Sequence, residues 1–359
     1  MFNFLKSAIG LNSYLGIDIG TASIKLVEVA RGQGERPSLR NYGVLESLGP
    51  LERLNEAIQT STLRIVEKDA AALLKKLLEE VRPRSNEAVA SLPAFVVFTT
   101  LLEIPQMPVG DMAKALPYQV SQHIPLPISD VAIDWLLVGE REDERGFIKQ
   151  QVLVVSVPNE QVRRYQAIFK LAGLKLKALE VETMGLVRSL IVGDVTPTMI
   201  IDIGSYVTNI AIVDKGFLKY NFQTDFASSS LSQAIARGLN IEVKRAEELK
   251  RQKGLLGTGG EYELSTLTVP LLDAILNETE KARGTFEREQ GIKLERVILA
   301  GGGVNLLGIE KYFEQQLNLP AVIGNPFSKV EYSSQIEPLV KSLSPSLAVA
   351  IGLGIKEFI

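Results

Sequence analysis

Cysteine is absent from this 359-residue sequence, and histidine and tryptophan occur once each. Without cysteine the chain forms no disulfide bond and offers no thiolate to a metal or a substrate, which suits a reducing cytoplasm. The single histidine, His123, excludes metal sites that are built from several imidazoles. Thiol-dependent enzymes and multi-histidine metalloenzymes are therefore excluded.

Neither a large excess of one charge nor a long apolar run is present. The formal net charge is −3 at pH 7, which gives no general reason to expect nucleic-acid binding. Apolar runs such as residues 347–355 fall short of the roughly 20 residues that a membrane helix needs. The N-terminus also lacks the basic-then-apolar order of a signal peptide. We expect a globular α/β protein, long enough for two domains.

Two widespread site motifs are missing as well. The sequence has no Gly-x-x-x-x-Gly-Lys-Ser/Thr loop, so it is not a P-loop protein. It has no Gly-x-Ser-x-Gly elbow, and the lone Gly352-Leu-Gly354 is too short to identify a dinucleotide site. A nucleotide site in this chain must therefore use a different kind of loop.

The sequence instead contains one strand–turn–strand pattern twice. Residues 14–29 read Tyr-Leu-Gly-Ile-Asp-Ile-Gly-Thr-Ala-Ser-Ile-Lys-Leu-Val-Glu-Val, and residues 199–213 read Met-Ile-Ile-Asp-Ile-Gly-Ser-Tyr-Val-Thr-Asn-Ile-Ala-Ile-Val. Three pairs of positions correspond: Asp18 with Asp202, Gly20 with Gly204, and Thr21 with Ser205. Each copy predicts a β-hairpin that carries an acid and a hydroxyl beside a glycine turn.

Such a hairpin is suited to holding a polyphosphate. Backbone N–H groups in a concave turn bind phosphate, and glycine lets the chain approach closely. Lys25 can neutralise phosphate charge, and carboxylates such as Asp18 and Asp202 suit a magnesium ion that keeps its water shell. Further hydroxyl donors are available at Thr21, Ser23, Ser205 and Thr208. One copy alone could equally be a strand that ends in a turn, but two copies favour a phosphate site.

Two further segments have the chemistry of a nucleoside site. Gly301-Gly-Gly-Val-Asn follows a predicted core strand at residues 296–300, and ligands of layered α/β folds bind at such strand ends. Alone, a triple glycine could also be a flexible turn. Glu247 and Lys250 lie three residues apart on a predicted helix. They form either a solvated ion pair or contacts to ribose and adenine.

The rest of the chain alternates between strand and helix patterns, which is typical of a layered α/β protein. Helices are predicted at residues 69–81, 111–123, 159–171, 183–191, 231–238, 243–253 and 270–290, with a small-residue helix from Pro345. Other strands are predicted at residues 40–48, 87–92, 95–104, 132–138, 151–157 and 176–181. The β-α-β-β order between residues 93 and 158 predicts an inserted subdomain, since long structureless loops are rare. A domain boundary is predicted at residues 193–197.

Two other features have mainly structural interpretations. Phe2, Leu5 and Ile9 share one face of a predicted N-terminal helix. We interpret it as packed on its own domain, with docking on a membrane surface or partner as the alternative. His123 lies at a predicted helix end, where an imidazole interacts with the last carbonyl groups. It is assigned no catalytic role.

In this order the motifs resemble the actin-like ATPase superfamily. The resemblance lies in two phosphate loops at Asp18 and Asp202, an adenosine loop at Gly301, and the small-residue closing helix. The inserted unit resembles the extra subdomain of the FtsA branch. Phe2-Asn-Phe-Leu-Lys and Gln122-His-Ile-Pro-Leu-Pro-Ile-Ser-Asp-Val-Ala-Ile-Asp-Trp are similar to the PilM family. Members of that family are cytoplasmic components of type IV pilus assembly and of related secretion and competence systems.

The resemblance implies an α/β actin-like ATPase fold, with two RNase H-like lobes around a nucleotide cleft and an FtsA-type inserted subdomain. The first lobe core would comprise residues 13–92, 158–194 and 345–359, and the insertion residues 93–157. The second lobe core would comprise residues 195–230 and 297–344, with a helical subdomain at residues 231–296.

The resemblance also implies ATP and Mg²⁺ as cofactors. The implied phosphate-binding residues are Gly20, Thr21, Ala22, Ser23, Lys25, Gly204, Ser205, Tyr206 and Thr208. The implied adenosine-binding residues are Glu247, Lys250, Gly301, Gly302, Gly303 and Val304. Asp18 and Asp202 would organise magnesium through water. No motif marks a residue that aligns the attacking water, so no catalytic residue is named and hydrolysis is expected to be weak or absent.

The implied partner is the N-terminal cytoplasmic peptide of the membrane protein PilN, held in a groove beside the inserted subdomain. Because PilN belongs to a membrane complex with PilO, the PilN/PilO complex is an implied partner as well. Binding to pilus motor ATPases and self-association are left open as further interactions. We expect a cytoplasmic protein at the inner-membrane face, held there by partners and binding no nucleic acid.

Two alternative functions on the same fold are a small-molecule kinase and a filament-forming division protein like FtsA. A kinase would need a carboxylate base in the interdomain cleft and usually carries further signature loops, and we find no such loops. FtsA carries a membrane helix after a linker, whereas this sequence ends at Ile359 directly after its last predicted core helix.

Overall fold

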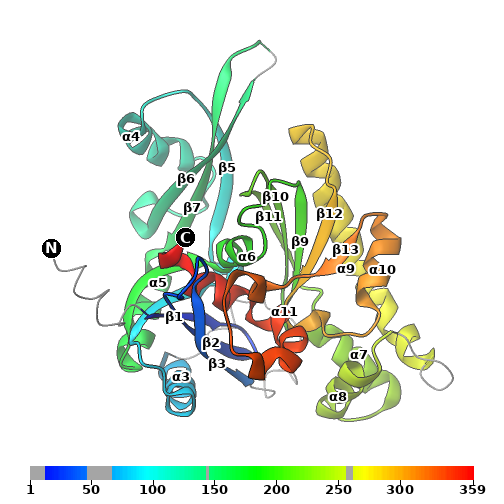
Figure 1. Cartoon of the computed structure of the whole chain (residues 1–359). Coiled ribbons are helices and arrows are strands. Elements are labelled where there is room, and N and C mark those ends of the chain that lie inside the picture. The colour runs from blue at the N-terminus through cyan, green and yellow to red at the C-terminus, as the bar shows by residue number, and fades with distance from the viewer. Residues whose placement is uncertain (1–12, 47–66, 143–144, 256–261) are drawn as a thin grey trace.

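The computed structural model describes residues 13–46, 67–142, 145–255 and 262–359, and contains three β-sheets with helices packed on them (Figure 1). Figure 1 shows two sheets side by side in the body of the molecule, with the third standing above them. The predicted N-terminal helix that carries Phe2, Leu5 and Ile9 lies outside the described residues.

The first sheet has the strand order β3-β2-β1-β4-β8. Its strands are β1 (Ser13–Ile19), β2 (Ser23–Ala30), β3 (Ser38–Glu46), β4 (Glu87–Leu92) and β8 (Lys175–Val181). The first three form an antiparallel meander, whereas β4 and β8 run parallel to β1. Helices α3 (Glu67–Val81) and α5 (Asn159–Leu171) pack their apolar sides on this sheet. Helix α11 (Glu337–Gly354) covers the opposite face, so the central strands are apolar on both sides.

The second sheet repeats this topology with the order β11-β10-β9-β12-β13. Its strands are β9 (Thr198–Ile203), β10 (Thr208–Asp214), β11 (Phe217–Thr224), β12 (Arg296–Ala300) and β13 (Ala321–Ile323). Helices α9 (Tyr262–Gln290) and α10 (Ile309–Leu317) share a hydrophobic core with it, and α7 (Ser228–Leu239) packs beside α8 (Val243–Lys253). The repeated hairpin pattern in the sequence therefore corresponds to two sheets with the same topology.

The third sheet comes from the segment that was predicted as an insertion. It has the order β5-β7-β6, with β5 (Phe98–Pro105), α4 (Val109–Val120), β6 (Val131–Glu142) and β7 (Ile148–Pro158). The predicted β-α-β-β order is confirmed. The sheet has a small core of its own, but Val138 and Leu153 at its base belong to a core shared with both other sheets.

Two helices cross between the first and second sheets, α6 (Glu182–Leu190) and α11 (Glu337–Gly354) (Figure 1). Their backbones touch at Gly185 and Gly352, since a Cβ on Gly352 would lie 1.9 Å from the Gly185 carbonyl oxygen. Residues 334–354 are long and apolar enough to cross a membrane. Residues 347–354 are all buried, however, so we assign α11 to the protein core.

Proline positions account for the main differences from the predicted helix boundaries. Pro270 and Pro345 were expected to begin helices, because proline fits the first turn best. The structure has both of them inside longer helices, α9 and α11. Leu264 of α9 is buried against α7 and α8, and Val340 of α11 is buried against the first sheet. This tertiary packing stabilises the turns that precede the prolines, and the local pattern does not contain it. Elements β11, α10 and β13 were not predicted.

Candidate functional site

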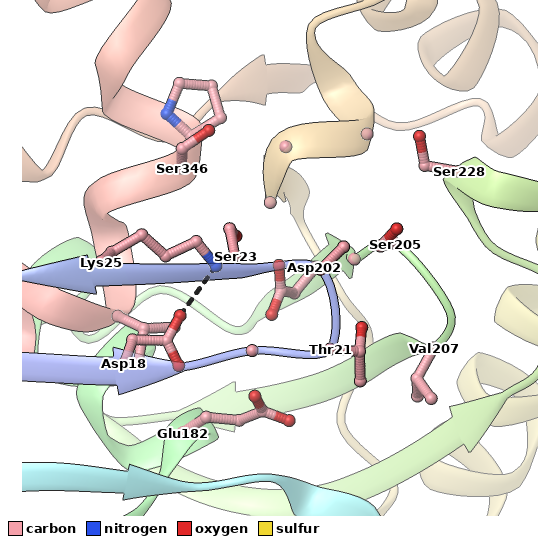
Figure 2. Close-up of a pocket in the computed structure, with 18 of the residues that line it drawn as sticks. Asp18, Thr21, Ser23, Lys25, Glu182, Asp202, Ser205, Val207, Ser228 and Ser346 are labelled. Carbon is pink, nitrogen blue, oxygen red and sulfur yellow. Dashed lines mark hydrogen bonds and ion pairs between the residues drawn. The ribbon is translucent and has the colours of Figure 1, made fainter. Parts of the chain in front are cut away.

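The two hairpins meet at a cavity of about 140 Å³ between the first and second sheets, called the hairpin cavity below (Figure 2). Loops from both hairpins, the loop after β12, and the helices α6, α8 and α11 contribute to its wall. The predicted site residues that line it are Asp18, Gly20, Thr21, Ala22, Ser23, Lys25, Asp202, Gly204, Ser205, Glu247, Gly301, Gly302 and Gly303. The structure thus brings together three loops that are far apart in the sequence.

The two hairpin turns have the same hydrogen bond. Gly20 N donates to the Ser23 carbonyl oxygen at 2.9 Å, and Gly204 N donates to the Val207 carbonyl oxygen at 3.0 Å. A Cβ on Gly204 would lie 2.6 Å from that Val207 oxygen, so only glycine fits the second turn in this form. The tips of the two hairpins approach one another across the cavity (Figure 2).

The loop after β12 closes the cavity from the second sheet. Gly301 has φ +84°, and its N–H donates to the Pro345 carbonyl oxygen of α11 at 3.0 Å. A Cβ on Gly301 would lie 2.3 Å from Asp202 Oδ1, whereas the nearest atom to a Cβ on Gly302 would be Ser346 Oγ at 3.6 Å. Gly301 is therefore required by packing, while Gly302 leaves open space at the cavity wall.

Acidic groups gather on the floor of the hairpin cavity (Figure 2). Asp18 accepts hydrogen bonds from Lys25 Nζ at 2.8 Å and from Ser91 Oγ at 2.7 Å. Burial lowers the pKa of Lys25, but the adjacent Asp18 carboxylate outweighs this and the net pKa is raised. Burial also raises the pKa of Asp202 to about 6, with Lys25 acting against the rise and Asp18 adding to it.

Glu182, the first residue of α6, is a third acid of this cluster, and sequence reasoning missed it. Its Oε1 accepts from Ala94 N and from Asn209 Nδ2, both at 2.8 Å. Burial raises the pKa of Glu182 to about 8, and the charges of Asp202 and Asp18 raise it in the same direction. The available signal was its position directly after a core strand, where α/β folds bind ligands.

Glu247 and Lys250 have different positions, although both were expected at the adenosine. Glu247 lines the cavity, whereas Lys250 is buried behind it and donates to Glu247 Oε2 at 2.6 Å and to Ser228 Oγ at 2.6 Å. The cation of α8 that does line the cavity is Arg251, whose Nε donates to Glu247 Oε1 at 2.8 Å. Burial would raise the pKa of Glu247, but the Lys250 charge and the hydrogen bonds it accepts lower it to about 2.

Three other predicted residues do not reach the cavity wall. Tyr206 and Val304 are buried in hydrophobic clusters. Thr208 Oγ1 donates to the Phe226 carbonyl oxygen at 2.7 Å, because its side chain points to the opposite face of the hairpin. Strand side chains alternate, so the equivalent of Lys25 is Asn209, which does line the cavity. The alternation in the sequence contained this signal.

The residues present fit a magnesium-bound polyphosphate. Asp18, Asp202 and Glu182 supply hard oxygen atoms, and Asn209 Oδ1 is buried without a hydrogen-bond partner. Within the described ranges, no set of three or more acidic, histidine or cysteine side chains could hold a metal directly. Mg²⁺ commonly keeps several waters, so contact through water stays a prediction. The cavity is smaller than the roughly 300–1,000 Å³ of typical ligand pockets, so a whole nucleotide requires its walls to move apart.

A second hollow of about 540 Å³ lies between the first and third sheets, called the edge groove below. It lies along β6 and β8, each of which is the outermost strand of its sheet among the described strands. Apolar residues of the wall include Trp135, Leu136 and Leu176, and one end has the charged residues Glu180, Arg188 and Lys356. Open sheet edges and an apolar wall suit an extended peptide that binds as an added strand.

Comparison with known proteins identifies relatives of the whole chain. The profile of a family described as "Type IV pilus assembly protein PilM" matches residues 16–358. The structure is similar to one described as "PilM-PilN type IV pilus biogenesis complex", with a TM-score of 0.81 and 24% identity over 96% of this chain and 98% of that chain. It is also similar to ADP-bound MreB5 of Spiroplasma citri, with a TM-score of 0.55 and 14% identity over 96% of both chains.

A curated relative matches part of the chain. The cell division protein FtsA of Staphylococcus epidermidis is 24% identical over an alignment of 168 residues, and the match covers 40% of this chain and 36% of that protein. The match thus spans about a third of the relative's length. These likenesses confirm the predicted actin-like fold and its relationship to the FtsA branch.

Proposed function

The chain belongs to the PilM family, and from this we propose that it is an ATP-binding, actin-like component of a type IV pilus assembly platform or of a related secretion or competence system. The observation that carries the proposal is the meeting of two phosphate-type hairpins and the Gly301 loop at one cavity. The kinase and division-protein alternatives have no comparable support.

Each wall of the hairpin cavity has a role in the proposed binding of Mg²⁺ and ATP. Backbone N–H groups of the two turns would hold phosphate oxygens, supported by the hydroxyls of Thr21 and Ser205. Asp18 and Asp202 would hold the water shell of the magnesium ion, which neutralises phosphate charge when bound. On the opposite side, Glu247, Arg251 and the open position at Gly302 would contact the nucleoside.

We propose slow or absent hydrolysis. Binding is supported by the two hairpins and the Gly301 loop that line the cavity, whereas no motif marks a residue that aligns the attacking water.

The proposed partner is the N-terminal cytoplasmic peptide of PilN, bound in the edge groove. The groove has two open strand edges and an apolar wall, and the similar solved structure is described as a PilM–PilN complex. Binding to PilN would hold the chain at the cytoplasmic face of the inner membrane and bring it to the PilN/PilO complex. Pilus motor ATPases and self-association form no part of the proposal.

Isothermal titration with a PilN N-terminal peptide tests the partner. We expect saturable binding, and we expect Trp135→Ala to weaken it by roughly 30-fold, the effect of losing one aromatic anchor of about 2 kcal/mol. Tyr118→Ala is the matched control, since Tyr118 is 80% exposed on α4 and does not line the groove. Absence of binding heat at several temperatures would contradict the proposal.

A further inference from the structure

Another hollow, of about 440 Å³, lies between the second and third sheets and is called the β5–β11 hollow below. It follows β5 and β11, each of which is the outermost strand of its sheet among the described strands. Figure 1 shows β5 on the side of the third sheet that faces the second sheet. The third sheet therefore has a hollow along each of its two outer strands, since the edge groove lies along β6.

The lining residues show that this hollow follows strand edges. Residues 99–101 of β5 and residues 219–221 of β11 all line it. Neighbouring side chains of a strand point to opposite faces, so a hollow that touches three consecutive residues lies along the edge. Among the described residues, β5 pairs with β7 and β11 with β10, and no backbone hydrogen bond joins β5 to β11. Both edges therefore offer unpaired backbone groups to an added strand.

Side chains, rather than backbone pairing, connect the two edges. Lys219 Nζ of β11 donates to the Val138 carbonyl oxygen at 2.6 Å and to Gln151 Oε1 at 2.8 Å. Gln151 Nε2 donates in turn to Glu103 Oε1 at 3.1 Å and to Gln290 Oε1 at 2.9 Å. Lys219 and Gln151 are 6% and 5% exposed, so water hardly competes for these bonds. The network ties the third sheet to β11 and α9, and the hollow is therefore preformed.

The charges around the hollow indicate which kind of strand would fit. Glu103 is already paired with Arg141 at 3.2 Å. Glu289 of α9 is exposed, and it has no ion-pair partner among the described residues. Burial raises the pKa of the neighbouring Tyr220, and the charge of Glu289 raises it further. The charge that is left for a ligand to neutralise is therefore negative.

We propose that the β5–β11 hollow is a second peptide site, which binds an extended segment of a partner protein as an added strand, with a lysine or arginine of that segment facing Glu289. The inference goes beyond the proposed function and does not depend on it. Among the described lining residues, the hollow shares only Leu153 with the edge groove and none with the hairpin cavity. Its rim includes Thr99 and Asn221, so it should select a more polar segment than the edge groove does.

Selection from a phage-displayed library of random linear peptides of about eight residues, a usual strand length, locates the site. The library is selected on the full wild-type chain and, in parallel, on Thr99→Trp. The indole should fill the hollow, because Thr99 lies on the same strand face as Leu101 and Glu103. We expect a set of proline-poor peptides that is enriched on the wild-type chain alone, and an unchanged melting temperature in Thr99→Trp. If no peptide is enriched on the wild-type chain alone, the proposal is overturned.

Charge reversal at Glu289 tests the chemistry of the partner without filling the hollow. A lysine-containing peptide from the selection should bind Glu289→Lys at least about fivefold more weakly than the wild-type chain, the size expected for an exposed ion pair. The same peptide with glutamate in place of lysine should bind Glu289→Lys more tightly than the wild-type chain. Glu314→Lys is the matched control, since Glu314 is an exposed acid of α10 outside the hollow. Equal affinities for the wild-type chain and Glu289→Lys would contradict the basic partner.

Methylation of the peptide backbone separates strand addition from side-chain binding. N-methyl groups on alternate residues remove the N–H groups that face one strand edge, while the side chains stay the same. Because the segment would lie between two edges, methylation of either alternate set should weaken binding. Unchanged affinity for both methylated peptides would show that no strand is added.

Discussion

Asn209 in the second hairpin stands where Lys25 stands in the first. Lys25 lies opposite Asp18 across the β1–β2 pair, and Asn209 lies opposite Asp202 across the β9–β10 pair. The two hairpins therefore have one shape but different charge, because an ammonium faces the first aspartate and a neutral amide faces the second. Because no cation lies directly opposite Asp202, burial is the largest effect on its pKa and raises that pKa to about 6.

This asymmetry predicts the effect of removing the cation. Lys25→Met should destabilise the fold by about 3–5 kcal/mol, the usual result of breaking one side of a buried ion pair. Combining it with Asp18→Asn should cost less than the sum of the two single changes, since the pair acts as a unit. Urea unfolding measures both, with Lys177→Met as the control at a largely exposed pair with Glu87. Additive costs in the double variant would contradict the pairing.

In the glycine loop after β12, alanine substitutions at the adjacent positions Gly301 and Gly302 are expected to have different effects. Gly302→Ala should fold normally but weaken nucleotide binding, because its new methyl group projects into open space at the cavity wall. Gly301→Ala should lower the melting temperature, since the methyl group meets Asp202 in a backbone conformation at φ +84°. Calorimetry and nucleotide titration distinguish the two effects. Equal melting temperatures for the two variants would show that the loop relaxes.

The Glu247 network predicts how stability depends on pH. Because the folded pKa of Glu247 is lowered to about 2 from an ordinary value of 4.5, its contribution is fully present above pH 4.5. The contribution is lost as the pH falls from 4.5 towards 2. Glu247→Gln should therefore flatten this part of the stability profile, measured by urea unfolding at each pH. Glu248→Gln is the matched control, as Glu248 forms an exposed pair with Arg245, and it should leave the profile unchanged.

A fourth prediction concerns the cavity entrance, where Arg251 Nη2 on α8 forms an ion pair with Glu46 Oε1 on β3 at 3.2 Å. Both side chains are about half exposed, so this pair adds under about 1 kcal/mol to stability. It does link α8 to β3 beside the cavity. Glu46→Gln leaves the pair between Arg251 and Glu247 in place, so it should speed nucleotide release with little change in melting temperature.

Stopped-flow measurement with a fluorescent ATP analogue tests the entrance pair. Glu248→Gln is the control, because it neutralises an exposed acid of α8 that does not line the cavity. An unchanged dissociation rate in Glu46→Gln would show that the pair does not slow nucleotide release.

Local signals in the sequence were sufficient for the framework of the site. The repeated acid, glycine and alternating apolar residues predicted both hairpins, and the structure brings Asp18 and Asp202 to one cavity. The bounds of α5, α8 and β12 agree with the predicted ranges for the same reason, since each has a clear period and end signal.

Tertiary packing determined the rest of the site. Glu182 and Arg251 reach the cavity only through the packing of α6 and α8, which no short motif records. Lys250 and Arg251 lie three and four residues after Glu247, so helix spacing alone cannot tell which of them faces the cavity. Glu182 could be recognised only as an acid at the end of a parallel strand.

The open edges of β6 and β8 also bear on how the protein is produced. An unpaired strand edge is a template for association with other strands, so a copy whose groove is empty carries an aggregation liability. The proposed peptide would cover both strand edges at once. The tendency of this chain to aggregate should therefore depend on its amount relative to the protein that carries the peptide. Balanced synthesis should keep the chain soluble, and co-expression with the peptide should raise its soluble yield.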